Sequence, residues 1–145
     1  MPPEMPHSYQ VVGRSQAPGS AEILAKGERI VIDASPAMAG DAPGPAELLA
    51  PAFAACSLKN VERFAQMLPF RQTGAWIHVT ATRQDSPPKF TRISYELHVR
   101  TDEPPERVDL LYRNIQRHGT VFNTLAAACE VTGEIIAEPL EEEIP

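Results

Sequence analysis

The feature that most constrains this chain is a long stretch of helical periodicity that lies between two prolines. From Pro45 to Pro69, mostly apolar residues recur at steps of three and four, which is the repeat of one face of an α-helix. The residues on this face are Leu49, Phe53, Cys56, Asn60, Phe64 and Met67. Proline is well suited to the first turn of a helix, whereas Pro69 and Gly74 end one. We expect one long helix with Cys56 midway along its buried stripe, bent one turn earlier by Pro51.

Strand patterns lie before this helix. Tyr9–Val12 and the longer stretch 21–33 are typical of strands. Lys26-Gly27 supplies the turn of a hairpin inside that longer stretch, between residues 21–25 and 28–33. A loop rich in proline and glycine, 35–44, then leads to the helix.

A second hairpin is predicted after the helix, from strands at 75–84 and 89–100. Apolar and polar residues alternate along its second strand, which is typical of a half-buried antiparallel sheet. The residues expected to face the core are Ile93, Tyr95, Leu97 and Val99, and those expected to face outward are Arg92, Ser94, Glu96, His98 and Arg100.

The last third of the chain predicts a shorter helix that begins near Asp102 and ends at Gly119. Its apolar face holds Val108, Leu111, Ile115 and His118. An alanine-rich turn, 121–128, leads to Cys129, and 134–138 is expected to form a final strand. This order predicts a single α+β domain over residues 9–138, between a flexible N-terminal segment, 1–8, and an acidic tail, 139–145.

Composition argues against several classes of function. The chain has 13 Lys and Arg against 19 Asp and Glu, and the formal net charge of −6 disfavours binding to a nucleic-acid backbone. No apolar run approaches the roughly 18 residues of a membrane span, and the N-terminus lacks a signal pattern, so we expect a cytoplasmic protein. The two cysteines and four histidines form no zinc-binding pattern, and we expect neither a metal nor a cofactor.

The sequences around the two cysteines resemble one known family. Cys56 ends the segment Pro45-Ala46-Glu47-Leu48-Leu49-Ala50-Pro51-Ala52-Phe53-Ala54-Ala55-Cys56, and the other cysteine opens Cys129-Glu130-Val131-Thr132. The first segment resembles the Pro-x-Glu-Leu-Leu helix start and Ala-Ala-Cys ending of the OsmC/Ohr family of thiol peroxidases. The second is similar to the Cys-Pro-Val-Ser box of that family. The order of elements from Tyr9 to Ile136 also matches.

The resemblance implies an architecture and a set of roles. It implies an intertwined homodimer in which antiparallel sheet packs around a long central helix that carries the first cysteine. It further implies that Cys56 attacks the peroxide, that Cys129 resolves it as a disulfide, and that Arg14 and Glu47 assist. Arg29 is a less close substitute for Arg14. In the organic-hydroperoxide branch the glutamate lies one residue earlier, where this chain has Ala46. An external dithiol, lipoyl-type or small, is implied as the reductant.

The chemistry explains why these residue types are needed. A free thiol has a pKa of about 8.5, and apolar surroundings disfavour the thiolate further, so a guanidinium such as that of Arg14 is required nearby. The thiolate attacks the O–O bond and becomes a sulfenic acid, which a second thiol converts to a disulfide. The apolar surroundings favour an organic hydroperoxide over hydrogen peroxide. Glu130, in place of the proline that is usual in the family, would disfavour a thiolate at Cys129 unless it points to solvent.

Two other functions fit the same sequence. A non-catalytic protein that binds small molecules or acyl chains on the same fold is left open by Ala46 and Glu130. A structural dimer with two inert, buried thiols is the third possibility, because a lone cysteine on an apolar helix face is usually a small hydrophobic residue. A peroxide-coupled assay separates the first function from the other two.

Overall fold

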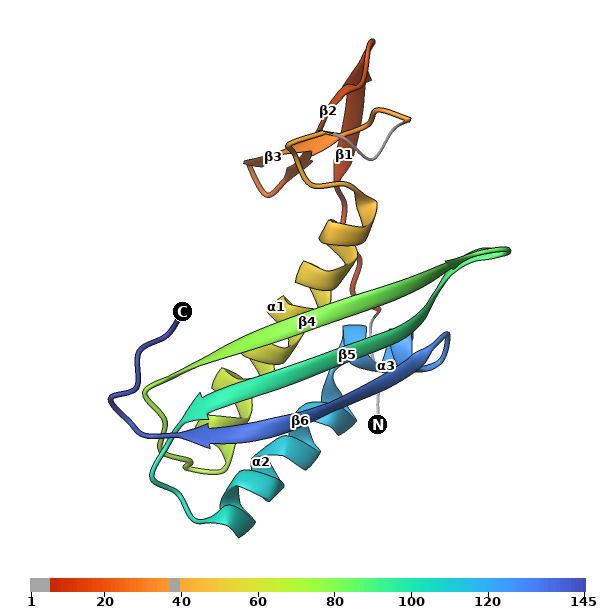
Figure 1. Cartoon of the computed structure of the whole chain (residues 1–145). Helices are drawn as coiled ribbons and strands as arrows, with labels where there is room; N and C mark the ends of the chain where they lie inside the picture. The colour runs from red at the N-terminus through yellow and green to blue at the C-terminus, as the bar shows by residue number, and fades with distance from the viewer. Residues whose placement is uncertain (1–5, 37–39) are drawn as a thin grey trace. The chain divides into compact units, whose positions relative to one another are not determined.

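The structure is a computed structural model that describes residues 6–36 and 40–145. The predicted flexible segment, 1–8, therefore falls mostly outside the described residues, as does part of the expected loop at 35–44. The chain forms two compact units, Met1–Leu48 and Leu49–Pro145, and the single domain over residues 9–138 stays a prediction. The division follows from the sheets, because two separate three-stranded sheets are present, one in each unit (Figure 1).

The first unit is an antiparallel meander of β1 (Val12–Gln16), β2 (Ser20–Ala25) and β3 (Glu28–Asp33). The predicted hairpin turn is confirmed: Lys26 and Gly27 have φ of 49° and 79°, as a two-residue hairpin of type I′ requires. The prediction of a strand at Tyr9–Val12 is wrong in position. The first strand starts at Val12 because the turn at residues 17–19 sets its pairing with β2, from Gln16 opposite Ser20.

The long helix predicted from the periodicity is α1 (Pro45–Met67), which carries the chain into the second unit. Phe53, Val61 and Phe64 are its most deeply buried side chains. The buried stripe ends earlier than expected, because the Met67 side chain is 63% exposed.

The second unit continues with β4 (Gly74–Asp85), β5 (Pro88–Arg100), α2 (Pro105–His118), α3 (Thr120–Ala126) and β6 (Glu130–Glu138). The expected all-antiparallel sheet is wrong for its last strand. The connection through α2 and α3 returns the chain to the end at which β5 starts, so β6 pairs with β5 in parallel. The expected turn at 121–128 is largely the helix α3, and β6 begins four residues before the predicted strand.

Helices α1 and α2 supply the side chains that cover one face of this sheet (Figure 1). The core consists of Phe53, Val61, Phe64, Ala65, Phe70, Ile93, Tyr95, Leu97, Val99, Val108, Leu111 and Ile115. The inward-facing set predicted on β5 is therefore confirmed. His98 was expected to face outward into solvent, yet it is 8% exposed, because its ring stacks on Trp76 at 3.8 Å and its Nδ1 lies 2.7 Å from the Glu138 carboxylate.

The acidic C-terminal segment is attached to the start of the sheet. The Thr73 hydroxyl donates to the Leu140 carbonyl at 2.6 Å, and the Arg100 guanidinium donates to the Glu142 carbonyl at 2.9 Å. Within the described residues, no helix is long and apolar enough to cross a membrane.

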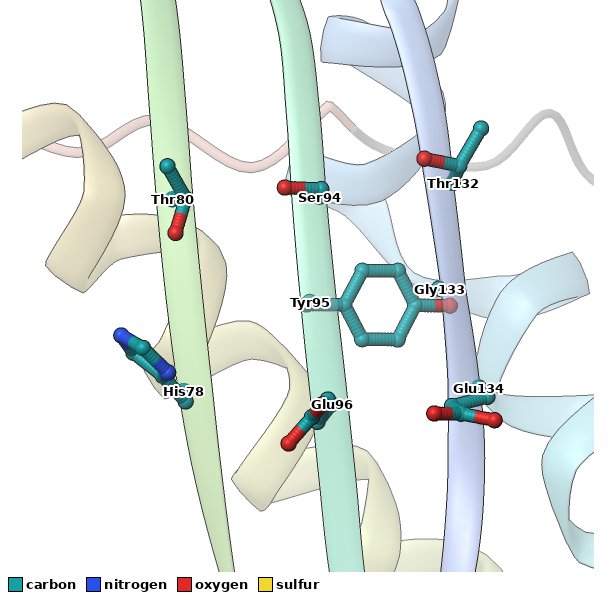
Figure 2. Close-up of a pocket in the computed structure, with 8 residues that line it drawn as sticks. All are labelled: His78, Thr80, Ser94, Tyr95, Glu96, Thr132, Gly133 and Glu134. Carbon is teal, nitrogen blue, oxygen red and sulfur yellow. The ribbon is translucent and has the colours of Figure 1, made fainter.

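Gly133 gives a test of this packing. The Tyr95 ring lies over Gly133 (Figure 2), and its hydroxyl is 2.7 Å from that of Tyr112 on α2. A Cβ at residue 133 would stand 2.5 Å from three ring carbons of Tyr95. Gly133→Ala is therefore expected to lower the free energy of unfolding by about 1–3 kcal/mol, as overpacking of a core does. Urea denaturation measures the change. Thr132→Ser, at the exposed neighbouring position, is the matched control, and equal stability of the two variants would contradict the packing.

Candidate functional site

Cys56 lies on α1, half-buried, with its sulfur facing the beginning of α3. A Cβ built on Gly119, the residue just before α3, would lie 3.4 Å from the Cys56 Sγ. The same Cβ would stand 2.9 Å from the Phe122 Cβ, so the glycine at 119 allows α3 to begin this close to the sulfur. Cys56 is a free thiol.

Asn60 supplies a polar partner for this sulfur. Its side-chain amide nitrogen is 3.6 Å from the Cys56 Sγ, one helical turn further along α1. Asn60 is only 7% exposed, so its N–H groups have little access to water. The amide therefore gives the sulfur a hydrogen-bond donor that is largely screened from water.

An aromatic cluster packs beside the cysteine. Phe53, one turn before Cys56, has its ring 5.2 Å from that of Tyr95 and 5.7 Å from that of Phe122 on α3. Burial raises the pKa of Tyr95 and that of Tyr112, whose hydroxyls share a hydrogen bond. Both phenols therefore stay protonated near neutral pH, and the cluster presents an uncharged wall.

Cys129 lies past the other end of α3. Its thiol donates to the Leu125 carbonyl at 3.3 Å, and it packs partly buried against the core. Cys56 is next to Gly119 and Phe53 is next to Phe122, so this part of α1 contacts the beginning of α3. Seven helical residues then separate Gly119 from the segment that holds Cys129, a rise of about 10 Å.

The structure places the two predicted redox cysteines at opposite ends of α3, and a disulfide between them stays a prediction. The physical reason is that the alanine-rich segment forms a helix where a turn was expected, and a helix holds its two ends apart. No signal in the spacing of the cysteines distinguishes these outcomes. Glu130, which follows Cys129, forms an ion pair with Arg92 at 3.2 Å, and both side chains are 56% exposed. This is the outward orientation that the sequence left open.

Arg14 and Arg29, the two predicted arginines, lie on β1 and β3 of the first unit. Both guanidinium groups form ion pairs with the same carboxylate, that of Glu22 on β2. The hydrogen bond from Arg14 holds the pKa of Glu22 below its usual value. The contact of Arg14 with Cys56 stays a prediction, whereas the pairing of Arg14 and Arg29 through one glutamate is a feature that sequence reasoning missed.

Glu47 has a structural role at the start of α1. Its carboxylate accepts the backbone N–H of Gly44 at 3.2 Å, three residues earlier. This is the backward half of a capping box, which satisfies a free N–H at a helix N-terminus. A catalytic role for Glu47 stays a prediction.

A second polar surface lies on the outer face of the β4–β5–β6 sheet (Figure 2). It is a shallow depression of about 470 Å³, lined mainly by His78, Thr80, Ser94, Glu96, Thr132 and Glu134. None of the residues that sequence reasoning selected lies there. In the described part of the chain, no cluster of three or more His, Cys, Asp or Glu side chains is arranged to hold a metal ion.

Asn60 can be tested independently of any enzymatic activity. In Asn60→Asp a carboxylate replaces the amide 3.6 Å from the sulfur and repels the thiolate. We expect Cys56 to react with iodoacetamide several-fold more slowly at neutral pH than in the parent protein, with the time profile of alkylation followed by peptide mass spectrometry. Glu62→Gln, an exposed position on the same helix, is the control. An unchanged profile in Asn60→Asp would show that the amide does not act on the sulfur.

Comparisons with known proteins agree with this fold. The sequence model of the OsmC-like protein family matches residues 38–134. An OsmC-like protein from Mycoplasma pneumoniae superposes with a TM-score of 0.83 at 16% identity, covering 92% of this chain and 99% of that one. An organic hydroperoxide resistance protein OsmC from Legionella pneumophila gives 0.73 at 14% identity, covering 90% and 98%.

A third solved structure, an organic hydroperoxide resistance protein from Elizabethkingia anophelis, gives a TM-score of 0.75 at 10% identity and covers 92% of this chain and all of its own. A search of curated proteins found no match. The family match covers well over half of the sequence, and it includes both the helix that carries Cys56 and the segment at Gly119 that faces it. The chain therefore belongs to the family of OsmC-like proteins.

Proposed function

We propose that this protein is a thiol-dependent peroxidase that reduces organic hydroperoxides through Cys56. The observation that carries the proposal is the setting of the Cys56 sulfur: half-buried, 3.6 Å from the amide of Asn60, and beside an aromatic wall. Two proteins of similar fold are named organic hydroperoxide resistance proteins, which supports the same chemistry here.

The reaction follows from the residues around the sulfur. The Cys56 thiolate attacks one oxygen of the O–O bond, that bond breaks, and two electrons pass from sulfur to the peroxide. Cys56 becomes a sulfenic acid, and the departing alkoxide takes up a proton and leaves as an alcohol. The donor at Asn60 stabilises the thiolate before attack.

The wall of Phe53 and Phe122 supports an organic substrate. Alkyl or aryl groups gain about 25 cal/mol for each Å² of apolar surface that leaves water. Phe122 is only half-buried, so it has surface left for such a group. Hydrogen peroxide has no alkyl group and gains nothing from this wall.

Arg14 is proposed as the cation that assists the thiolate, held in place by Glu22. The Glu22 side chain is 14% exposed and neutralises only one of the two guanidinium groups that contact it. One positive charge therefore remains on this pair of arginines. A guanidinium keeps its charge when it is partly buried, so it suits this role.

The removal of Cys56 tests the proposed function directly. Cys56→Ser is expected to lower cumene hydroperoxide consumption, coupled to dihydrolipoamide, to the rate of buffer alone, because a serine hydroxyl is not ionised at neutral pH. Lys59→Ala, at an exposed position on the same helix, is expected to keep the parent rate. The parent protein should also turn over cumene hydroperoxide faster than hydrogen peroxide. Absence of turnover in the parent protein would reject the peroxidase and favour a binding protein on this fold.

A homodimer is part of the proposal, supported by apolar side chains left open on the first unit. Val11, Val12 and Val31 are 63%, 59% and 52% exposed, and Tyr9 is 87% exposed. Exposed apolar side chains on β1, on β3 and just before β1 would give a second chain apolar surface to bury. Light scattering should give twice the 15.9 kDa of one chain, and a mass of one chain at micromolar concentration would contradict the dimer.

A further inference from the structure

We infer that oxidised Cys56 is reduced directly by a separate thiol molecule, without passing through a disulfide with Cys129. The inference rests on the proposed function, since it concerns the second half of the same cycle. It names the chemical class of the co-reactant, a small thiol or dithiol, and assigns Cys129 a structural position outside that cycle.

The course of α3 separates Cys56 from Cys129 by more than a disulfide can span. A disulfide needs the two Cα atoms within about 7 Å. Cys56 faces Gly119 at the beginning of α3, and Cys129 follows its end, a rise of about 10 Å along the helix axis. Phe53, one turn before Cys56, contacts Phe122 in the first turn of α3, so this part of α1 meets the beginning of α3 and not the end that leads to Cys129.

Cys129 is held in place just before β6 by its own contact and by that of its neighbour. Its thiol donates to the Leu125 carbonyl at 3.3 Å. Glu130, the next residue, is opposite Arg92 in the parallel ladder and forms an ion pair with it. Moving the sulfur to Cys56 would require α3 to unwind and the first residues of β6 to leave the sheet.

The residue that faces Cys56 is Gly119, which has neither a side chain nor a thiol. A Cβ there would lie 3.4 Å from the sulfur and only 2.9 Å from the Phe122 Cβ, so the close approach of α3 to Cys56 depends on glycine. The sulfenic acid formed on Cys56 therefore has no resolving thiol of its own at this place. An external thiol has to supply the sulfur.

The step balances with two thiol groups. A first thiol attacks the sulfenic sulfur, forms a mixed disulfide with Cys56 and releases the sulfenic oxygen as water. A second thiol attacks the mixed disulfide and restores the Cys56 thiol, so two thiols are oxidised for each peroxide reduced. A dithiol provides both sulfurs in one molecule, whereas a monothiol leaves the mixed disulfide long enough to be measured.

The experiment treats the unaltered protein with one equivalent of cumene hydroperoxide and then with glutathione, the monothiol probe. Intact mass and peptide mapping follow under non-reducing conditions. We expect one glutathione adduct, located on the peptide that contains Cys56. With dihydrolipoamide as reductant, Cys129→Ser should keep the parent turnover within about 2-fold, because Cys129 takes no part. The measurement on the parent protein does not depend on the folding of any variant.

Each other outcome overturns the inference. A loss of two hydrogens with the peptides of Cys56 and Cys129 linked would show internal resolution. A disulfide between two chains through Cys56 would show resolution by a second copy. No oxidation of either cysteine, with no turnover, would remove the proposed function itself, which the first two outcomes would leave standing.

Gly119→Cys in the Cys129→Ser background is the positive control for the geometry. Its Cβ would lie 3.4 Å from the Cys56 Sγ and 2.9 Å from the Phe122 Cβ. Once the start of α3 shifts by a few tenths of an ångström, the same oxidation should remove two hydrogens and prevent the glutathione adduct. An adduct on Cys56 that still forms in full in the folded double variant would contradict the proximity of residue 119 to the sulfur.

Discussion

The packing of Phe53 against Tyr95 is the contact on which the rest of the site depends. It fixes the rotation of α1 against β5, because Phe53 is fully buried and its ring centroid lies 5.2 Å from that of Tyr95. With Phe53 turned to the sheet, Cys56 and Asn60 point toward α3, each about one further turn along the helix. Gly133 allows the Tyr95 ring to reach Tyr112, and so ties the same contact to α2.

The direction of α3 then determines what chemistry is open to the thiol. The beginning of α3 meets the reactive sulfur, and its end carries the chain away to β6. A buried amide is next to the sulfur, and a second thiol is not. This arrangement suits a cysteine that a separate thiol molecule reduces after each turnover.

Much of the fold could be predicted from the sequence, where the pattern was long and regular. The repeat from Pro45 to Pro69 predicted α1, and strict alternation predicted the inward face of β5. The parallel pairing of β6 could not be predicted, because strand direction depends on the course of α2 and α3, not on the strand itself. The buried state of His98 depends on Glu138, which meets it only through that pairing, and on Trp76, which is its partner across the β4–β5 hairpin.

The site was harder to predict than the fold. The helical repeat of α1 placed Cys56 on the buried face. It placed Asn60 on the same face four residues later, but nothing in the sequence indicated that the Asn60 amide contacts the sulfur. Glu47 is explained locally, by its hydrogen bond to Gly44. The distance between Cys56 and Cys129 was not accessible, because sequence separation does not say whether the segment that joins them is a turn or a helix.

The most direct test of this account is trapping of sulfenic acid with dimedone after one equivalent of cumene hydroperoxide, with the label located by peptide mass spectrometry. Labelling should appear on the peptide that contains Cys56, while Cys129 remains an unmodified thiol. Labelling of Cys129 in place of Cys56, or of neither, would contradict the central claim that the helix sulfur beside Asn60 and Gly119 is the one that reacts with peroxide.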